Sequence, residues 1–235
     1  MPTSAVTYWL KNRRFRSQMD NLNPRTDATR ASYDAIASDY AEQQINQLYP
    51  NSFEVYLLNY FIQQIDAQKT VCDLGCGPGQ VAAYLHEQAV PTVGVDLSPG
   101  MIEQARKLHP AIPFQQADMR ALSFSDNELA GIVAFYSLIH ISRDEVVTVL
   151  AELHRVIYQN GYLLLSFYLG KKDGHRTEWF DKSVSLDFIL ITLPEIKRYL
   201  RQSGFKSEIL IEHSSTHQSE APYGFVLARK IRRRP

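Results

Sequence analysis

Regular alternation of short apolar runs with helical patterns between residues 69 and 168 is the feature that most constrains the fold of this chain. The runs KTVCDL, TVGVDL, IPFQQA, LAGIVAFYSL and YLLLSFYL have the length and apolar content of buried strands. Helical patterns separate them, among them QVAAYLHEQ and a segment that opens on Ser98 and Pro99, a good N-cap followed by a tolerated first-turn proline. Such alternation predicts a mostly parallel, doubly wound sheet with helices on both faces.

The second half of the chain contains two sequence patterns typical of helix N-termini. Ser142 and Glu145 match a capping box, and the helix that they open is expected to stop at Asn160-Gly161. Thr192 and Glu195 match a second box, before a helix that ends near Gly204. The runs SEILIE and GFVLARK then predict two strands whose connection is too short for a helical crossover, so we expect them to pair antiparallel.

Two helices are expected before the sheet. One places Tyr33, Ile36, Ala37 and Tyr40 on a single face, and the other runs roughly over residues 52–64. No linker divides the chain, so we expect an N-terminal extension and one domain. The expected parts are the extension (1–25) and the domain (26–235), the latter made of a helical cap (26–66), a core (67–168), an insertion (169–191) and a C-terminal helix with two strands (192–235).

Charge and composition narrow the function classes. The 235 residues carry 25 Lys+Arg and 25 Asp+Glu, so nucleic acid and anionic membranes are not the expected partners. No apolar run approaches the ~20 residues that span a bilayer, and the N-terminus does not resemble a secretory signal. The two cysteines, Cys72 and Cys76, exclude a disulfide framework and favour a cytoplasmic location. Their spacing is not that of a zinc pair, so we expect no metal.

The stretch VCDLGCGPGQ carries glycines at 75, 77 and 79, between an expected strand and an expected helix. No lysine follows them, which argues against a phosphate-binding P-loop. A dinucleotide loop fits the acidic Asp96, but its third glycine would come one residue later, and Asp73 would repel a pyrophosphate. A carboxylate at that position favours a nucleoside joined to an ammonium or sulfonium group.

Four segments, VCDLGCGPGQ, VGVDLS, FQQADMRALSF and LAGIVAFYSLIHIS, resemble in order and spacing the successive motifs of class I S-adenosylmethionine-dependent methyltransferases, and most closely those that act on small molecules. The resemblance covers approximately residues 28 to 230. It implies a Rossmann-like α/β fold with a seven-stranded sheet, mostly parallel with an antiparallel last strand, and with N-terminal helices.

The resemblance also implies roles for the residues that end the strands. The loop with Gly75, Cys76, Gly77 and Gly79 would lie under the methionine part of the cofactor, and Asp73 would orient its amino group. Asp96 would accept hydrogen bonds from both ribose hydroxyls, since a carboxylate has two acceptor oxygens. The remaining contacts implied are Leu97 and Met101 beside the adenine, Asp118 at its amino group, the Met119 N–H at a ring nitrogen, and Tyr136 near the methyl group.

The acceptor side is less defined by sequence. Tyr33 and Tyr40 are expected either to close over the cofactor as a lid or to pack on one helical face. Tyr136 and His140 are the candidate catalytic residues: the histidine either takes a proton, with a pKa near neutrality, or orients the loop after the fourth strand. Candidate acceptor contacts in the insertion are His175, Arg176, Trp179 and Phe180.

The resemblance therefore predicts an enzyme that transfers a methyl group from S-adenosylmethionine to a small molecule. Two alternatives stay open: an NAD(P)-dependent oxidoreductase, and an S-adenosylmethionine-binding protein without turnover. A monomer or homodimer is expected, and the acceptor atom is not encoded in any motif of the sequence.

Overall fold

The computed structural model describes residues 23–44, 48, 52–213 and 222–232. Most of the expected N-terminal extension lies outside these residues. The helices are α3 (Pro24–Gln44), α4 (Phe53–Gln64), α5 (Gln80–Glu87), α6 (Pro99–Leu108), the 3₁₀ turn η1 (Leu138–His140), α7 (Val146–Val156) and α8 (Leu193–Gln202). The strands are β1 (Val71–Leu74), β2 (Thr92–Asp96), β3 (Phe114–Gln116), β4 (Leu129–Phe135), β5 (Ile157–Tyr168), β6 (Gly174–Trp179), β7 (Lys182–Phe188), β8 (Phe205–His213) and β9 (Tyr223–Lys230).

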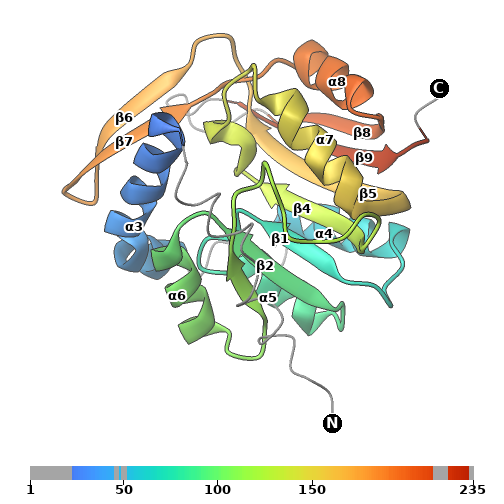
Figure 1. The fold of residues 1–235 in the computed structure, drawn as a ribbon, viewed down its shortest axis with the longest axis horizontal. Coiled ribbons are helices and arrows are strands. Elements are labelled where there is room, and N and C mark those ends of the chain that lie inside the picture. The colour runs from blue at the N-terminus through green and yellow to red at the C-terminus, as the bar shows by residue number, and fades with distance from the viewer. Residues whose placement is uncertain (1–22, 45–47, 49–51, 214–221, 233–235) are drawn as a thin grey trace.

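A seven-stranded sheet in the order β3-β2-β1-β4-β5-β9-β8 forms the centre of the molecule (Figure 1). Parallel pairing joins β3, β2, β1, β4 and β5, whereas β9 is antiparallel to both β5 and β8. The predicted sheet, including its antiparallel last strand, is confirmed. The strand order reverses between β1 and β4, so a crevice is expected beyond their carboxyl ends.

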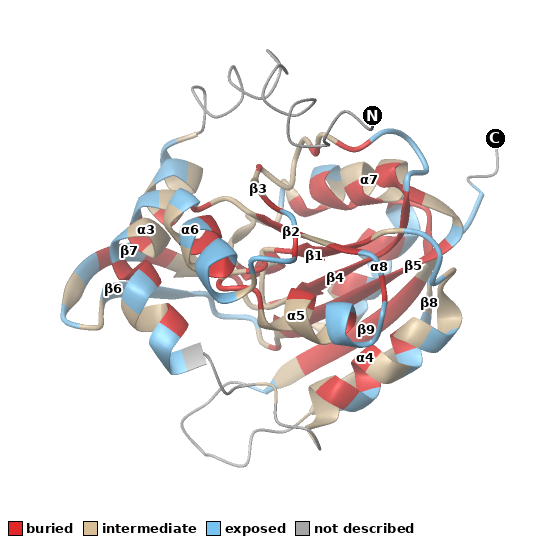
Figure 2. Ribbon diagram, turned by 90° about the horizontal axis from the view of Figure 1, so that it is seen from below, coloured by how far each residue is buried: buried red, intermediate tan, exposed pale blue. Residues whose placement is uncertain are grey.

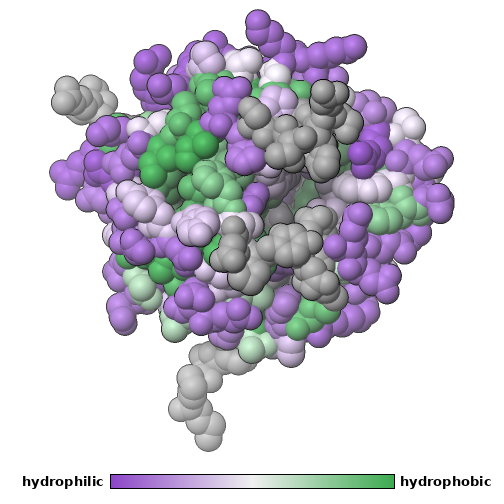
Figure 3. All heavy atoms as spheres, turned by 180° about the vertical axis from the view of Figure 1, so that it is seen from behind, coloured by the Kyte–Doolittle hydropathy of each residue, from purple (hydrophilic) through white to green (hydrophobic). Residues whose placement is uncertain are grey.

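Helices cover both faces of this sheet, as the alternation predicts. Side chains of α7 and α8 pack on one face, and those of α4 and α5 pack on the other. The inner strands β1, β4 and β9 are largely buried, while the edge strand β8 and the outer sides of the helices are partly or fully exposed (Figure 2). The face seen in Figure 3 carries mostly hydrophilic side chains with smaller hydrophobic areas between them, and it is hollowed near its centre. None of the helices in the described ranges is long and apolar enough to cross a membrane.

The segment between β5 and α8 is more regular than its sequence indicates. It forms the antiparallel hairpin β6–β7, which turns at Phe180 and Asp181 with both residues at positive φ. Strand β7 packs along α3, and α3 packs in turn against α6 (Figure 1). The hairpin and α3 therefore form one layer beside the carboxyl edge of the sheet.

The predicted boundaries of α7 are wrong at both ends. The helix begins at Val146, and the Ser142 hydroxyl donates to the Glu145 carboxylate at 2.6 Å instead of capping the backbone, because that carboxylate also pairs with Arg120. The helix ends at Val156, and Asn160-Gly161 lies inside β5. Pairing with β4 overrides the stop signal, and Asn160, at φ +67°, sits where the register of the two strands shifts.

Other helix caps match the sequence. The Ser98 hydroxyl accepts from the Met101 N–H at the start of α6, with Pro99 in the first turn. Thr192 and Glu195 form a reciprocal capping box at α8. Ser52 caps α4 through its side chain. Glu54, in the first turn of that helix, lines the crevice described next.

Candidate active site

The glycine loop after β1 is shaped by close contact with the segment after β4. Gly75 has φ +69°, and a Cβ atom there would lie 2.2 Å from the Cβ of Ser137. Only glycine combines this backbone conformation with this approach. The Gly75 and Cys76 N–H groups donate to the Val95 carbonyl, at 2.7 and 3.0 Å, so the loop is held between the ends of β2 and β4.

Asp73 is a buried carboxyl group behind this loop. It is 2 % exposed, and its Oδ2 accepts from the Ala82 N–H of α5 at 2.9 Å. Burial raises the pKa of Asp73 to about 7, the Ala82 hydrogen bond opposes that shift, and the nearby charge of Asp96 adds to it. A cationic group of a ligand in this crevice would favour the ionised form.

Asp96, at the end of β2, organises the neighbouring backbone. Its Oδ2 accepts from the Gly77 N–H and its Oδ1 from the Ser98 N–H, both at 2.8 Å. Burial raises the pKa of Asp96, and these two hydrogen bonds oppose the shift. An ionised carboxylate has about four acceptor positions, so each oxygen retains one for a ligand hydroxyl.

Asp118, after β3, is partly neutralised within the protein. Arg120 binds both of its oxygens, the shortest distance being 2.6 Å from Nη2 to Oδ2, and also reaches Glu145 at 2.6 Å. The ion pair fixes the orientation of the carboxylate beside the crevice. Sequence reasoning missed this role of Arg120, although its position two residues after Asp118 is a usable signal.

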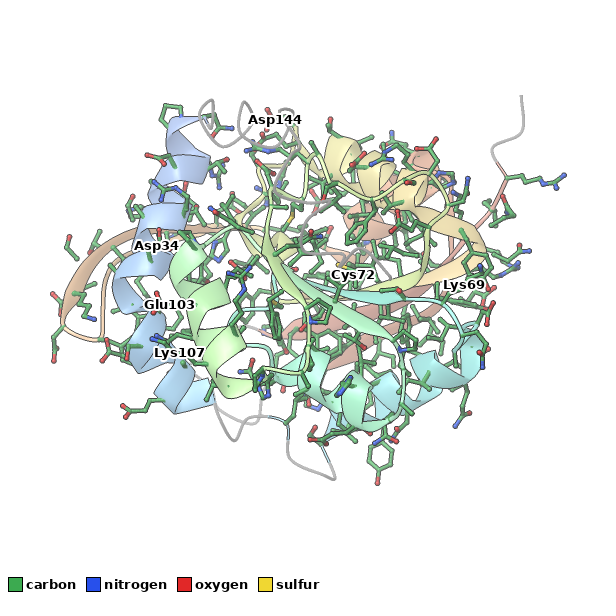
Figure 4. All side chains as sticks on the ribbon, turned by 60° about the horizontal axis from the view of Figure 1, so that its bottom comes forward. Asp34, Lys69, Cys72, Glu103, Lys107 and Asp144 are labelled. Carbon is green, nitrogen blue, oxygen red and sulfur yellow. The ribbon has the colours of Figure 1, made fainter. Side chains whose placement is uncertain are left out.

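Hydrogen bonds and an ion pair hold helix α3 beside the cavity. The Asp34 carboxylate accepts from the Ser98 hydroxyl at 2.5 Å and from the Gly100 N–H at 3.0 Å, at the N-terminus of α6. Figure 4 shows Asp34 on the side of α3 that faces α6. Further along the helix, Lys182 of β7 pairs with Asp39 at 2.6 Å. The predicted amphipathic face is confirmed, since Ile36 and Ala37 are buried.

His140 joins α3 to the turn after β4 and to β7. Its Nδ1 lies 2.7 Å from the Asp187 carbonyl oxygen, and its Nε2 lies 2.8 Å from the Tyr33 hydroxyl. A carbonyl oxygen only accepts, so Nδ1 carries the proton and Nε2 accepts from Tyr33. Burial lowers the pKa of His140 to about 4. The predicted near-neutral pKa is therefore wrong, because the ring is desolvated and neutral.

Tyr136 has an unusual backbone at the end of β4. Its φ is +52°, a conformation that costs a non-glycine residue about 1–2 kcal/mol. The Tyr136 N–H donates to the Ser166 hydroxyl at 2.9 Å, which helps to hold the conformation. Tyr136 packs beside Tyr168 and Tyr223, with ring centroids 5.4 and 6.2 Å away. Tyr136 and Ser137, at this strained turn, both line the crevice.

These groups surround one cavity of about 250 Å³. It collects twelve of the sequence-predicted cofactor residues, namely Asp73, Gly75, Cys76, Gly77, Asp96, Leu97, Met101, Asp118, Met119, Tyr136, Tyr33 and Tyr40, together with His140. Gly79 is not part of the lining: a Cβ there would lie 2.9 Å from the Phe114 ring, so this glycine serves the packing of the loop. The candidate acceptor contacts His175, Arg176, Trp179 and Phe180 are also outside the lining.

The tryptophan of the hairpin supports the cavity wall from behind. Trp179 packs on Tyr33 and Tyr40, with ring centroids 6.4 and 5.5 Å away. Sequence reasoning missed several lining residues, among them Thr26, Thr29, Leu48, Glu54, Gln80 and Val81. The cap at Ser52 is a usable signal for Glu54, because it predicts where that helix begins.

The two cysteines are buried thiols, and burial raises the pKa of each. Within the part of the chain that the structure describes, no group of three or more His, Cys, Asp or Glu side chains is placed to hold a metal ion.

The fold is doubly wound, and the cavity lies at the switch point of its sheet, between the ends of β1 and β4. Residues 71–161 match the family model described as "Methyltransferase domain". The chain is 36% identical over 98 residues to the uncharacterized methyltransferase YodH of Bacillus subtilis, covering 40% of this chain and 41% of that protein. It is 48% identical over 54 residues to trans-aconitate 2-methyltransferase of Escherichia coli, covering 22% and 21% respectively. The chain thus spans 41% and 21% of the lengths of these two curated relatives.

Solved structures share the fold at low identity. A S-adenosylmethionine-dependent methyltransferase from Methanosarcina mazei aligns with a TM-score of 0.67 at 16% identity, over 78% of this chain and 98% of that chain. The [4+2]-cyclase SpnF aligns with a TM-score of 0.65 at 17% identity, over 86% and 94%. Over residues 71–161 the chain is therefore similar to a methyltransferase domain, and it shares its fold with proteins described as S-adenosylmethionine-dependent methyltransferases, whose name gives S-adenosylmethionine as their cofactor.

The residues present fit that cofactor. Gly75 lets the loop lie directly against Ser137, and the buried hydroxyl of Ser137, which lines the cavity, has no hydrogen-bond partner in the structure. Asp73 and Asp96 supply acceptors for an ammonium group and for hydroxyls, and Asp118 adds a third carboxylate at the end of β3. This donor set suits a cationic nucleoside and does not suit a pyrophosphate.

Proposed function

We propose that this protein transfers the methyl group of S-adenosylmethionine to a small-molecule acceptor and releases S-adenosylhomocysteine. The single observation that carries the proposal is the convergence of Asp73, Asp96 and Asp118, from the ends of three adjacent parallel strands, on one cavity. The family match supports the donor side, and the size and enclosure of the cavity support a small acceptor.

Each carboxylate has a distinct task in this proposal. Asp73 holds the ammonium group of the methionine part, Asp96 accepts from the ribose hydroxyls, and Asp118 accepts from the adenine amino group. When bound, S-adenosylmethionine supplies a methyl carbon to which a nucleophile's lone pair bonds while the carbon–sulfur electron pair returns to sulfur. The contribution of this chain is to align the acceptor with that methyl group, an effect worth up to ~7–11 kcal/mol in favourable cases.

Tyr33 and His140 act on positioning in this proposal. The neutral ring of His140 holds the Tyr33 hydroxyl at 2.8 Å, which fixes α3 against the turn after β4. Tyr33, Tyr40 and Tyr136 then form the wall that keeps water away from the reacting groups. His140 is a positioning residue here, because its accepting nitrogen is already occupied by Tyr33.

The test is turnover with methyl-labelled S-adenosylmethionine and pools of amines, phenols, thiols and carboxylates. We expect label in one acceptor class and formation of S-adenosylhomocysteine. Asp96→Asn should weaken cofactor binding about tenfold to a hundredfold, because it removes a charged acceptor. Asp181→Asn is the matched control, since Asp181 is an exposed turn residue at φ +55°, a conformation that asparagine tolerates.

Two results would contradict the proposal. Binding of NAD(H) without S-adenosylhomocysteine would favour an oxidoreductase. Tight cofactor binding with no acceptor methylated from any pool would favour a binding protein, or another reaction on the same fold.

A further inference from the structure

The charged side chains that line the cavity, within the described residues, are all carboxylates. Its lining within the described ranges includes the carboxylates Glu54, Asp73, Asp96 and Asp118, and it includes no lysine or arginine. The proposed function assigns Asp73, Asp96 and Asp118, at the ends of β1, β2 and β3, to the cofactor. Glu54 is therefore the one carboxylate of this lining that is left to bind an acceptor. An anionic acceptor would enter a cavity whose fixed charges repel it.

Arg25, Arg120 and Arg176 lie in segments that contribute to or support the cavity wall, and each has a contact of its own. Arg120 binds Asp118 and Glu145, at 2.6 Å each, and Arg25 pairs with Asp187 at 3.1 Å. The guanidinium of Arg176 lies 4.4 Å from the centre of the Trp179 ring. A carboxylate or phosphate acceptor needs a bidentate guanidinium or a similar cationic partner, and none of these three arginines is in the cavity lining.

Glu54 faces an aromatic part of the cavity. It lies in the first turn of α4 and shares the lining with Leu48, Phe135 and Tyr136. Burial, and next the charge of Glu54, raise the pKa of the Tyr136 phenol, which indicates that this carboxylate is close to that ring. Glu54 also supplies the negative charge that the N-terminus of α4 favours, so this helix end does not call for an anionic ligand.

We infer that the acceptor is an amine with an apolar or aromatic body, and that Glu54 binds its amino group; this rests on the methyl transfer proposed above. A carboxylate beside aromatic faces is the arrangement that attracts an organic cation. The buried Ser137 hydroxyl without a partner, in the same lining, is a further polar group available to a ligand. Glu54 accepts an N–H hydrogen bond from the ammonium that arrives and from the free amine.

The step balances without a further reagent. The ammonium releases a proton to water, and the nitrogen lone pair then forms the bond to the methyl carbon. The carbon–sulfur bond breaks with its electron pair on sulfur. The N-methylammonium product then loses a proton to water or leaves as a cation.

The experiment uses the full chain, methyl-labelled S-adenosylmethionine and acceptors paired by shape and opposed in charge. The pairs are 2-phenylethylamine with 3-phenylpropanoate and octylamine with nonanoate, with trans-aconitate and a neutral phenol added. We expect turnover of amines alone. Glu54→Gln should raise KM for the amine about tenfold, with kcat within about twofold and the dissociation constant of the cofactor unchanged.

Glu87→Gln is the matched control, because Glu87 is exposed at the end of α5 and is not in the cavity lining. Turnover of trans-aconitate, of the other carboxylates or of the phenol alone would overturn the amine inference and leave methyl transfer standing. An unchanged amine KM in Glu54→Gln would also overturn it. Absence of cofactor binding, measured separately by calorimetry, would instead refute the proposed function.

Discussion

Cofactor binding should depend on pH through Asp73. Burial raises the pKa of this carboxyl group to about 7, so at pH 6 most of the free protein carries a protonated Asp73. The ammonium group of the cofactor favours the ionised form. Binding below pH 7 therefore releases a proton, and affinity should increase as pH rises through the pKa of Asp73.

The size of the effect follows from that pKa. If only the ionised form binds, the apparent dissociation constant is the intrinsic one multiplied by one plus 10^(pKa − pH). With a pKa of about 7, the factor is about 11 at pH 6 and about 1.3 at pH 7.5. We therefore expect affinity for S-adenosylhomocysteine to rise about eightfold over this range. His140 titrates near pH 4 and does not contribute in this window.

Isothermal titration calorimetry with S-adenosylhomocysteine measures both parts of the prediction. Titrations at pH 6 in two buffers of different ionisation enthalpy should show release of about 0.9 proton per ligand bound. Asp73→Asn should bind more weakly at pH 7.5 and lose this proton release, because its amide does not titrate. Asp181→Asn should behave as the wild type.

A flat affinity between pH 6 and 7.5, with no proton release, would refute the reasoning. Either Asp73 would then be ionised in the free protein, or the ammonium group would not lie beside it. Proton release that persists in Asp73→Asn would assign the titration to another group, of which Asp96 is the nearest candidate, since burial also raises its pKa.

Three other substitutions test the architecture of the site. Gly75→Ala should destabilise the fold by about 2–4 kcal/mol in urea denaturation, because it adds left-handed backbone strain and a clash with Ser137. The control is Gly174→Ala, where the atom nearest to the added Cβ is 3.8 Å away, and it should cost about 0.5 kcal/mol or less. Equal effects of the two substitutions would refute the close approach of Gly75 to Ser137. Tyr33→Phe should cost about 1 kcal/mol, measured in the same way, because it removes the hydrogen bond to His140; no loss would show that this bond adds nothing to stability. For His140, the folded pKa of about 4 lies below the unfolded value of 6.5, so its contribution is complete above pH 6.5 and falls as pH drops toward 4. The stability difference between wild type and His140→Gln should therefore shrink by about 3 kcal/mol over that window in thermal unfolding, and a constant difference would contradict the neutral ring.

The donor half of the site could be predicted because its residues lie at the ends of strands that the sequence makes recognisable. Asp73, Asp96 and Asp118 follow apolar runs directly, and parallel strands bring their carboxyl ends to one edge. The positions of these three residues along the chain are therefore enough to predict that they lie close together in space.

Errors arose where a side chain has two competing partners. Glu145 matches a capping residue, but its carboxylate binds Arg120, 25 positions away in the sequence. Asn160-Gly161 matches a helix stop, but pairing with β4 draws it into a strand. Sequence alone predicts that His140 titrates near neutrality, whereas the packing of α3 and β7 around the ring desolvates it and lowers its pKa. Tertiary contacts of this kind leave no local signal.

The acceptor half depends on segments that have no fixed relation to the strand ends. Glu54 comes from the first turn of α4, Tyr33 from α3, and Tyr136 from a strained turn after β4. Their convergence is a property of how α3 and α4 dock, through contacts such as that of Asp34 with the N-terminus of α6. The match to trans-aconitate 2-methyltransferase covers 54 residues, 22% of this chain, so the charge of the cavity is the stronger guide to the acceptor.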